Sequence, residues 1–168
     1  MSYTPTWTTS RIYGQLWLRA VLLVAPLFAA FFLPGEFADP DGTPWFLLAV
    51  LTFMTICMWP LAFAAHWVEG SATGLRLRYW PLLARAVTYD DLASVEYRPN
   101  ASPWDFGGIG LRLTSDGTAL VNRKGPGFAV RTNSGKSYFV IVKDDRELAD
   151  IRNHISQARQ DLSPELEA

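Results

Sequence analysis

The residues best suited to phosphate chemistry in this chain are the closely spaced glycines of Gly107-Gly108-Ile109-Gly110. A phosphate loop needs a strand before its glycines and a helix after them, because the helix N-terminus presents free backbone N–H groups to the phosphate. Here an alternating, strand-like segment follows, and no Gly-Lys-Ser/Thr triplet comes directly after the glycines. They are therefore predicted to form a hairpin or a β-bulge.

Metal and nucleophile chemistry have few candidate residues. The chain has two histidines, His66 and His154, and one cysteine, Cys57. One cysteine forms no disulfide within a chain and makes a cysteine-based zinc site very improbable. Both histidines are predicted to be surface or interfacial residues, and no serine has a histidine at a suggestive spacing, although sequence distance does not exclude a triad. We expect no catalytic residue, no metal and no cofactor, and a protein that is not an enzyme.

Basic and aromatic side chains are the better candidates, as contacts for a lipid or a protein partner. Arg78 and Arg85 flank the apolar segment 80–83, which either dips into a membrane surface or completes the core. Arg123 and Lys124 form a basic tip whose default interpretation is a solvated turn. The segment 104–106 either marks a partner surface or plugs one end of the domain. The candidate contact residues are Arg78, Trp80, Arg85, Trp104, Phe106, Arg123 and Lys124.

The distribution of apolar residues indicates which elements carry these side chains. The chain has 168 residues and a net charge of −1, which excludes a large basic footprint for nucleic acid. Its hydrophobic content of 49% is uneven, because residues 20–33 and 45–65 contain no charged side chain. The sequence therefore predicts a membrane anchor first, over residues 1–69, and a folded domain second.

Two membrane helices are predicted, over about residues 16–33 and 45–67. The second is roughly 35 Å long at 1.5 Å per residue, enough to cross a hydrocarbon core of ~30 Å. The first includes Arg19, which can snorkel to the interface. A buried helix of a soluble protein is the alternative for the second segment, and a cleaved signal peptide is the alternative for the first. The closeness of the two segments favours a helical hairpin.

Charge predicts the orientation of this hairpin. Arg11 and Arg19 precede or begin the first helix, whereas the loop 34–44 carries three acids and no base. Lysine and arginine are enriched on the cytoplasmic side of membrane proteins. Both termini are therefore expected to be cytoplasmic.

The remaining sequence predicts a mainly-β cytoplasmic domain over residues 70–160. Short apolar and polar alternations, separated by turn residues, indicate seven antiparallel strands. They cover residues 75–79, 85–89, 92–98, 109–113, 118–121, 128–132 and 136–142. A helix follows, with Asp144 as its cap, Glu147 three residues later and an apolar stripe that includes Ile151 and Ile155. Residues 161–168 are predicted to be a flexible tail.

The layout resembles that of the bacterial PH-like membrane proteins, which have a helical hairpin followed by a pleckstrin-homology-like domain. The local segments that carry the resemblance are Gly107-Gly108-Ile109-Gly110-Leu111-Arg112, Gly127-Phe128-Ala129-Val130, Gly135-Lys136 and Glu147-Leu148. The resemblance implies an N-terminal transmembrane hairpin in the bacterial inner membrane, then a PH-like seven-stranded barrel capped by one C-terminal α-helix. Eukaryotic PH domains bind phosphoinositides through basic residues around the first strand loop, but here the loop 80–83 is apolar.

Three functional hypotheses follow from these patterns. The first is a non-enzymatic interaction or scaffold module that acts as an accessory or assembly partner of another membrane protein or complex, or that forms a homo-oligomer. The second is a sensor of anionic lipid surfaces that uses Arg78, Arg85, Arg123 and Lys124. The third is a component of a membrane enzyme or transporter, although two helices enclose no pathway without oligomerisation. Membrane lipids are expected partners in each case, and nucleic acid is not.

Overall fold

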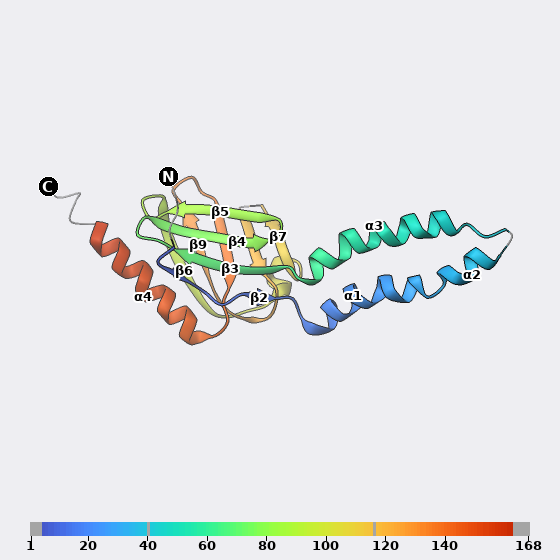
Figure 1. Cartoon of the computed structure of the whole chain (residues 1–168). Coiled ribbons are helices and arrows are strands. Elements are labelled where there is room, and N and C mark those ends of the chain that lie inside the picture. Colours follow the sequence, from blue (N-terminus) through green and yellow to red (C-terminus); the bar gives the residue numbers. More distant parts are fainter. Residues whose placement is uncertain (1–4, 40, 116, 163–168) are drawn as a thin grey trace. The chain divides into compact units, whose positions relative to one another are not determined.

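The C-terminal part of the chain alternates apolar and polar residues, and the computed structural model places most of it in strands (Figure 1). The structure describes residues 5–39, 41–115 and 117–162. These residues form two compact units. Residues 14–64 make a helical unit, and the segments up to Tyr13 and from Ala65 onward together make a β-rich unit.

The helical unit contains α1 (Leu16–Ala30), α2 (Leu33–Ala38) and α3 (Pro44–Ala62). Two of its segments, Leu16–Ala38 and Pro44–Ala62, are long and apolar enough to cross a membrane. The guanidinium Nε of Arg19 on α1 donates a hydrogen bond of 2.9 Å to the carbonyl of Ala62, the last residue of α3. A cation at this end of α3 also complements the negative end of the helix dipole.

The ends of the helices differ from those predicted. The first apolar segment continues as α2 to Ala38, beyond residue 33, and α3 ends at Ala62 rather than at residue 67. The last turn of α3 tightens, because Phe63 and Ala64 donate to carbonyls three residues back at 3.2 and 3.1 Å. From His66 the burial alternates with period two, so this apolar stretch continues as a strand.

The first sheet of the β-rich unit is an antiparallel meander with two short additions. Its long strands are β3 (Ala65–Gly70), β4 (Gly74–Trp80) and β5 (Leu83–Thr88). Two strands that precede the helical unit in sequence, β1 (Trp7–Thr8) and β2 (Ile12–Tyr13), pair antiparallel with β3. The residues on both sides of the helical segment therefore build one sheet.

The second sheet has the strand order β6-β9-β10-β8-β7. Its strands are β6 (Leu92–Ala101), β7 (Gly110–Thr114), β8 (Gly117–Val121), β9 (Gly125–Thr132) and β10 (Ser137–Ile141). Neighbours are antiparallel except β8 and β10, which pair in parallel. A 3₁₀ turn, η1 (Pro103–Phe106), connects β6 to β7.

The predicted strands correspond to β4 through β10, but their pairing differs from the expectation. The seven strands were predicted to be antiparallel, whereas β8 and β10 are parallel. The sheets of the described residues are two separate ladders, with no strand pairing that closes them into one barrel. A strand also follows the glycines at 107–110, as expected, because β7 begins at Gly110.

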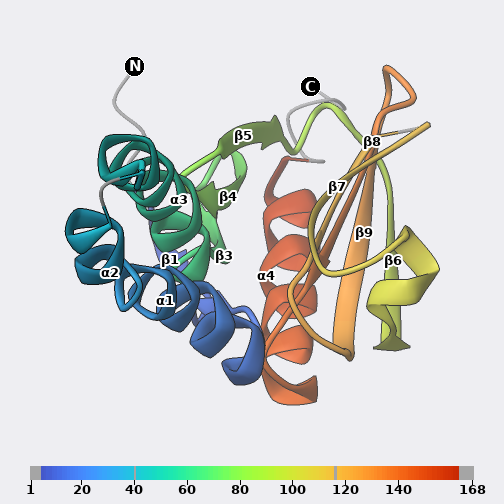
Figure 2. The ribbon, with the colours of Figure 1, turned by 90° about the vertical axis from the view of Figure 1, so that its right-hand side faces the viewer.

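The C-terminal helix α4 (Asp145–Leu162) contributes an apolar stripe to the core, and Figure 2 shows it between the two sheets. Leu148, Ile151 and Ile155 on this helix are buried. They lie in the same unit as the buried side chains of both sheets, which include Val68, Leu75, Leu77, Phe128, Val130 and Val140. Of the predicted tail, residues 161 and 162 belong to α4, and residues 163–168 lie outside the described residues.

Candidate interaction surfaces

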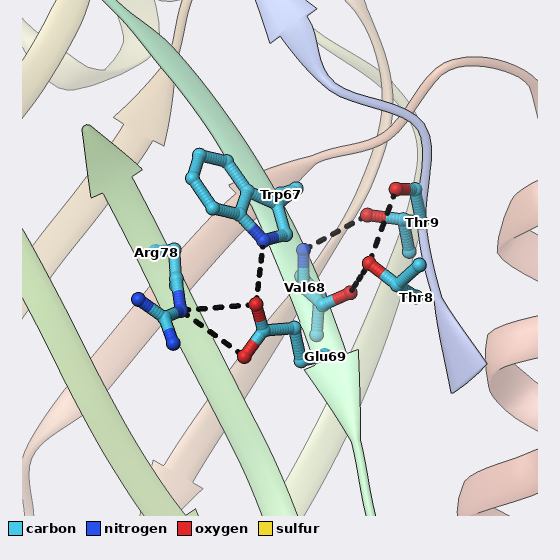
Figure 3. Close-up of polar contacts among 6 residues, drawn as sticks. All are labelled: Thr8, Thr9, Trp67, Val68, Glu69 and Arg78. Carbon is cyan, nitrogen blue, oxygen red and sulfur yellow. Dashed lines mark hydrogen bonds and ion pairs between the residues drawn. The ribbon is translucent and has the colours of Figure 1, made fainter. Parts of the chain in front are cut away.

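Arg78 is held in an ion pair on the outer face of the first sheet, as Figure 3 shows. Its Nε lies 3.0 Å from a carboxylate oxygen of Glu69, and that carboxylate also accepts a hydrogen bond of 2.9 Å from the indole of Trp67. The guanidinium of Arg78 also lies 5.9 Å from the centroid of the Trp67 ring. Its charge is therefore already compensated within the domain.

Arg85 lies on the other face of the same sheet. It is the register partner of buried Leu77, whereas Arg78 pairs with Ala84, so the two arginines are not brought together. Arg85 Nε donates a hydrogen bond of 3.0 Å to the hydroxyl of Tyr138 on β10. The guanidinium also lies 5.9 Å from the centroid of the Tyr138 ring, and the side chain of Arg85 is exposed.

The loop between β4 and β5 is exposed. Trp80 is 48% exposed and Leu82 is 62% exposed, while Leu83 is half-buried. The interpretation that Trp80 and the leucines complete the core is therefore wrong for Trp80 and Leu82. The first sheet ends at this turn, and no described element covers their side chains.

The two residues of the basic tip, Arg123 and Lys124, have different environments. Arg123 is half-buried, and its Nη2 donates to the backbone carbonyl of Lys143, whereas Lys124 is exposed. Arg123 also lies near His66, whose pKa is lowered to about 4, first by burial and further by this neighbouring positive charge. Arg123 therefore has a structural role that the sequence did not indicate.

The two histidines have different outcomes: His154 is an exposed surface residue, as predicted, whereas His66 is not. His66 is fully buried on β3, and its Nε2 lies 2.8 Å from the carbonyl of Ile141 on β10. The prediction of an interfacial residue at the end of a helix is wrong here, because α3 ends four residues earlier. His154 is exposed on α4 and stacks on Trp7 with a centroid distance of 5.0 Å.

Trp104 lies on a turn whose backbone is held by side-chain hydrogen bonds. Its side chain is 81% exposed, although η1 is fixed on both sides by hydrogen bonds. Ser102 Oγ accepts from the backbone N–H of Trp104, and the Asp105 carboxylate accepts from the N–H of Ser102 at 2.8 Å. Gly107 ends the turn with φ of +80°, a conformation that favours glycine.

Phe106 anchors this turn to the second sheet. Its ring stacks on Phe139 of β10 with a centroid distance of 4.4 Å and an interplanar angle of 20°. The two aromatic residues of the turn therefore have different roles, because Phe106 packs inward and Trp104 points to solvent. The interpretation that segment 104–106 plugs the domain fits Phe106 but not Trp104.

A hollow of about 310 Å³ lies beside this turn, and we call it the β9 groove. Its polar lining is Ser94, Glu96, Arg98, Arg131 and Ser137, and its apolar lining is Phe106, Ala129 and Phe139. Arg98 donates to Glu96 at 2.8 Å, and this hydrogen bond is the largest cause of the lowered pKa of Glu96. Of the residues that line this groove, the sequence analysis selected Phe106 as a candidate contact but did not select Arg98 or Arg131.

A second hollow of about 480 Å³, the edge pocket, lies where the edge strands β5 and β7 of the two sheets approach each other. The residues that line it include Leu83, Arg85, Leu113, Thr118, Lys136 and Tyr138. Its described lining contains two cations, hydroxyl groups and no carboxylate; Asp116, which precedes Gly117 in the sequence, lies outside the described residues. Such a pocket suits an anion.

Lys136 is a residue of this pocket that sequence reasoning did not select. It belongs to a Gly-Lys-Ser triplet at residues 135–137, which resembles the end of a P-loop. The structure places Gly135 and Lys136 before β10 and Ser137 at its first position, so the triplet leads into a strand and not a helix. The triplet was a usable signal for a basic turn, but its structural context is not that of a nucleotide-binding loop.

Comparisons of the chain with family models, with curated proteins and with solved structures gave no match. Among the described residues, no group of three or more His, Cys, Asp or Glu side chains is placed to hold a metal ion. The functional interpretation therefore depends on the two hollows and on the exposed turn that carries Trp104.

Proposed function

We propose that this protein is a membrane-anchored interaction module whose β-rich unit binds another membrane protein or complex through the turn that carries Trp104. The exposure of this indole on a hydrogen-bonded turn is the single observation that carries the proposal. Tryptophan and arginine are enriched among the residues that dominate binding energy, and a rigid turn loses little entropy on binding. The β9 groove beside the turn supplies arginines as well.

The helical unit is proposed to be a transmembrane hairpin in a bacterial inner membrane. Two segments of sufficient length and apolarity support this proposal. The pairing of β1 and β2 with β3 supports a hairpin that returns to the side from which it started, because these strands come from both sides of the helical segment. The arginine bias of the N-terminus makes that side the cytoplasm.

The β-rich unit is proposed to be PH-like in its general design. Support comes from the antiparallel meander of β3 to β5, the second sheet and the C-terminal helix with its buried stripe. The fold alone does not specify an activity, so the proposed scaffold role rests on the exposed turn.

Affinity purification of the full-length protein from its native membranes in mild detergent tests the proposed function. We expect a stoichiometric membrane-protein partner that is lost with Trp104→Ala. Trp80→Ala is the matched control, since it also removes an exposed indole but lies at the end of β4. A monomeric protein without a partner, or a partner that survives Trp104→Ala, would contradict the proposal.

The edge pocket favours a second candidate function, the recognition of anionic lipid surfaces. Arg85 and Lys136 supply positive charge, and Leu113, which lines the pocket, is 84% exposed. A lipid presents a similar combination of a charged headgroup and an apolar part, and each cation near an anionic membrane contributes about 1 kcal/mol. Of the residues first expected to serve this function, Arg78 and Arg123 are already engaged, whereas Arg85 lines the edge pocket and Lys124 is exposed elsewhere.

Hydrogen exchange of the full chain in nanodiscs tests this second function. Nanodiscs of phosphatidylcholine alone are compared with nanodiscs that also contain phosphatidylglycerol. We expect slower exchange over residues 83–88 and 136–141 with the anionic lipid, and loss of this protection in the Arg85→Gln, Lys136→Gln double variant. Arg146→Gln, at an exposed position of α4, is the control. Equal exchange in both lipids would exclude this function.

A further inference from the structure

The β9 groove contains a row of three polar side chains across three strands. Arg131 on β9 is the register partner of Ser94 on β6 and of Ser137 on β10. Register partners project from the same face of a sheet, with Cβ atoms about 5 Å apart. The side chain of Arg131 therefore starts between those of Ser94 and Ser137, and all three line the same hollow.

The next row of the sheet forms the apolar part of the groove. Ala129 is the register partner of Glu96 on one side and of Phe139 on the other. The small side chain of Ala129 leaves a depression between the larger side chains of Glu96 and Phe139. Phe106 stacks on Phe139 beside this depression. A side chain with a short aliphatic stem and a polar end would match these two rows.

The charges of the groove are unequal. Glu96 is paired with Arg98 at 2.8 Å, so these two charges compensate each other. Arg131 is exposed and makes no ion pair with any residue that the structure describes. The described lining therefore carries one net positive charge, from two arginines and one glutamate.

We propose that the β9 groove binds a single carboxylate side chain, glutamate or aspartate, of the partner protein that the Trp104 turn contacts. This inference rests on the proposed function and adds the chemistry that the partner must present. Arg131 donates to the carboxylate with the serine hydroxyls beside it, and the aliphatic stem packs over Ala129 against Phe106. Glu96 lies close enough to Arg131 for the arginine to lower the pKa of Glu96. The negative charge of Glu96 therefore repels a phosphate dianion bound at Arg131 more strongly than it repels a monoanionic carboxylate.

Defined peptides test the chemistry directly. The probes are three blocked hexapeptides that differ only at one central position, which is glutamate, glutamine or phosphoserine. The full chain in nanodiscs carries ¹³C-methyl alanine, and the Ala129 methyl group reports binding. We expect the glutamate peptide to bind about tenfold more tightly than the glutamine peptide, as is typical of a charge-assisted hydrogen bond.

Variants of Arg131 give the decisive comparison. Arg131→Gln should abolish the difference between the glutamate and glutamine peptides, and Arg131→Lys should restore part of it. Arg146→Gln on α4 is the control and should keep the full difference. Equal binding of the two peptides, tighter binding of the phosphoserine peptide, or a preference that survives Arg131→Gln would overturn the proposal.

The partner purification separates this inference from the proposed function. If Trp104→Ala removes the partner and Arg131→Gln does not, the groove proposal fails while the interaction module stands. If neither substitution affects a co-purifying protein, the interaction surface itself is wrong. Loss of the partner with each substitution, together with the peptide preference, supports both.

Discussion

At the scale of single residues, His66 is the side chain whose environment departs most from its ordinary one. It is fully buried, its Nε2 lies 2.8 Å from the Ile141 carbonyl, and its Nδ1 has no partner among the described residues. Since the carbonyl only accepts, Nε2 carries the proton and donates it. Burial lowers the pKa of His66 to about 4, against 6.5 for a histidine in the unfolded chain.

This shift predicts that acid destabilises the β-rich unit through His66. Between pH 6.5 and 4 the unfolded chain binds a proton that the folded chain does not, so stability falls as the pH decreases through this range. The loss at pH 4.5, relative to neutral pH, is about 2–3 kcal/mol. His66→Gln keeps a donor for Ile141 and should remove this part of the pH dependence, as measured by thermal unfolding in detergent at pH 7 and pH 4.5.

His154→Gln provides the control for this measurement, because it removes the exposed histidine of α4 and leaves His66 in place. It should retain the difference between the two pH values. An unchanged pH dependence in His66→Gln would show that other groups are responsible for acid destabilisation.

At the scale of elements, hydrogen bonds to two carboxylates fix the N-terminus of α4. Asp144 accepts from the N–H of Glu147 at 2.9 Å, which is the predicted cap. Glu147 accepts in turn from the N–H of Lys143 at 2.8 Å and from the N–H of Ser10 at 2.6 Å. Glu147 therefore joins the C-terminal helix to the segment between β1 and β2.

Removal of these carboxylates should destabilise the β-rich unit to different extents. Asp144→Ala should cost about 1 kcal/mol, the usual loss for a helix cap. Glu147→Ala should cost more, because it removes two hydrogen bonds, one of which connects distant segments. Thermal unfolding measures both effects, and Asp150→Ala on the exposed face of α4 is the control. A smaller effect for Glu147→Ala than for Asp144→Ala would contradict the role of Glu147 as a link.

The short N-terminal strand β1 should be necessary for a stable first sheet. The ring of Trp7 covers Gly70 so closely that a Cβ added to Gly70 would lie 2.0 Å from it, and the ring also stacks on His154. Trp7→Ala should therefore destabilise the β-rich unit by about 1–3 kcal/mol, the range for losing a partly buried aromatic side chain. Trp104→Ala, the same substitution at an exposed position, should leave the unfolding temperature nearly unchanged.

The elements that the sequence predicted are those with a clear period. Leu75 and Leu77 alternate with Arg76 and Arg78 in β4, and the apolar stripe that contains Ile151 identified α4. Strands β1 and β2 have only two residues each, too few for a period to be visible. Strand β3 was missed because its apolar start continues directly from α3.

The candidate surfaces were predictable as residue types but not as arrangements. The exposure of Trp104 and the inward packing of Phe106 follow from contacts with Phe139, a residue more than 30 positions away in the sequence. The separation of Arg78 and Arg85 onto opposite faces depends on the register of β4 with β5. The row through Arg131 depends on the pairing of β9 with β6, a strand distant in sequence, and local pattern does not specify that pairing.

At the scale of the whole molecule, the helical unit is an insertion between two strands that belong to one sheet. Tyr13 ends β2 and Ala65 begins β3, and these two residues are register partners. A membrane hairpin inserted at this point would cross the membrane twice. The chain would then return to the side that it left, as it must, because β2 and β3 belong to the same folded unit. This reasoning is independent of charge, and it agrees with the arginine bias that predicts cytoplasmic termini.

Cysteine labelling tests this topology as a whole. Cys57 is first replaced by serine, and single cysteines are then introduced by Ser10→Cys, Asp41→Cys or Ser134→Cys, at exposed positions before, within and after the helical hairpin. In intact cells a membrane-impermeant maleimide should label only the Asp41→Cys variant, and lysis should make the other two reactive. Labelling of both Ser10→Cys and Ser134→Cys in intact cells would reverse the orientation but keep the hairpin. Labelling of only one of these two would place β1 and β3 on opposite sides of the membrane, where they could not pair, and would rule out the hairpin.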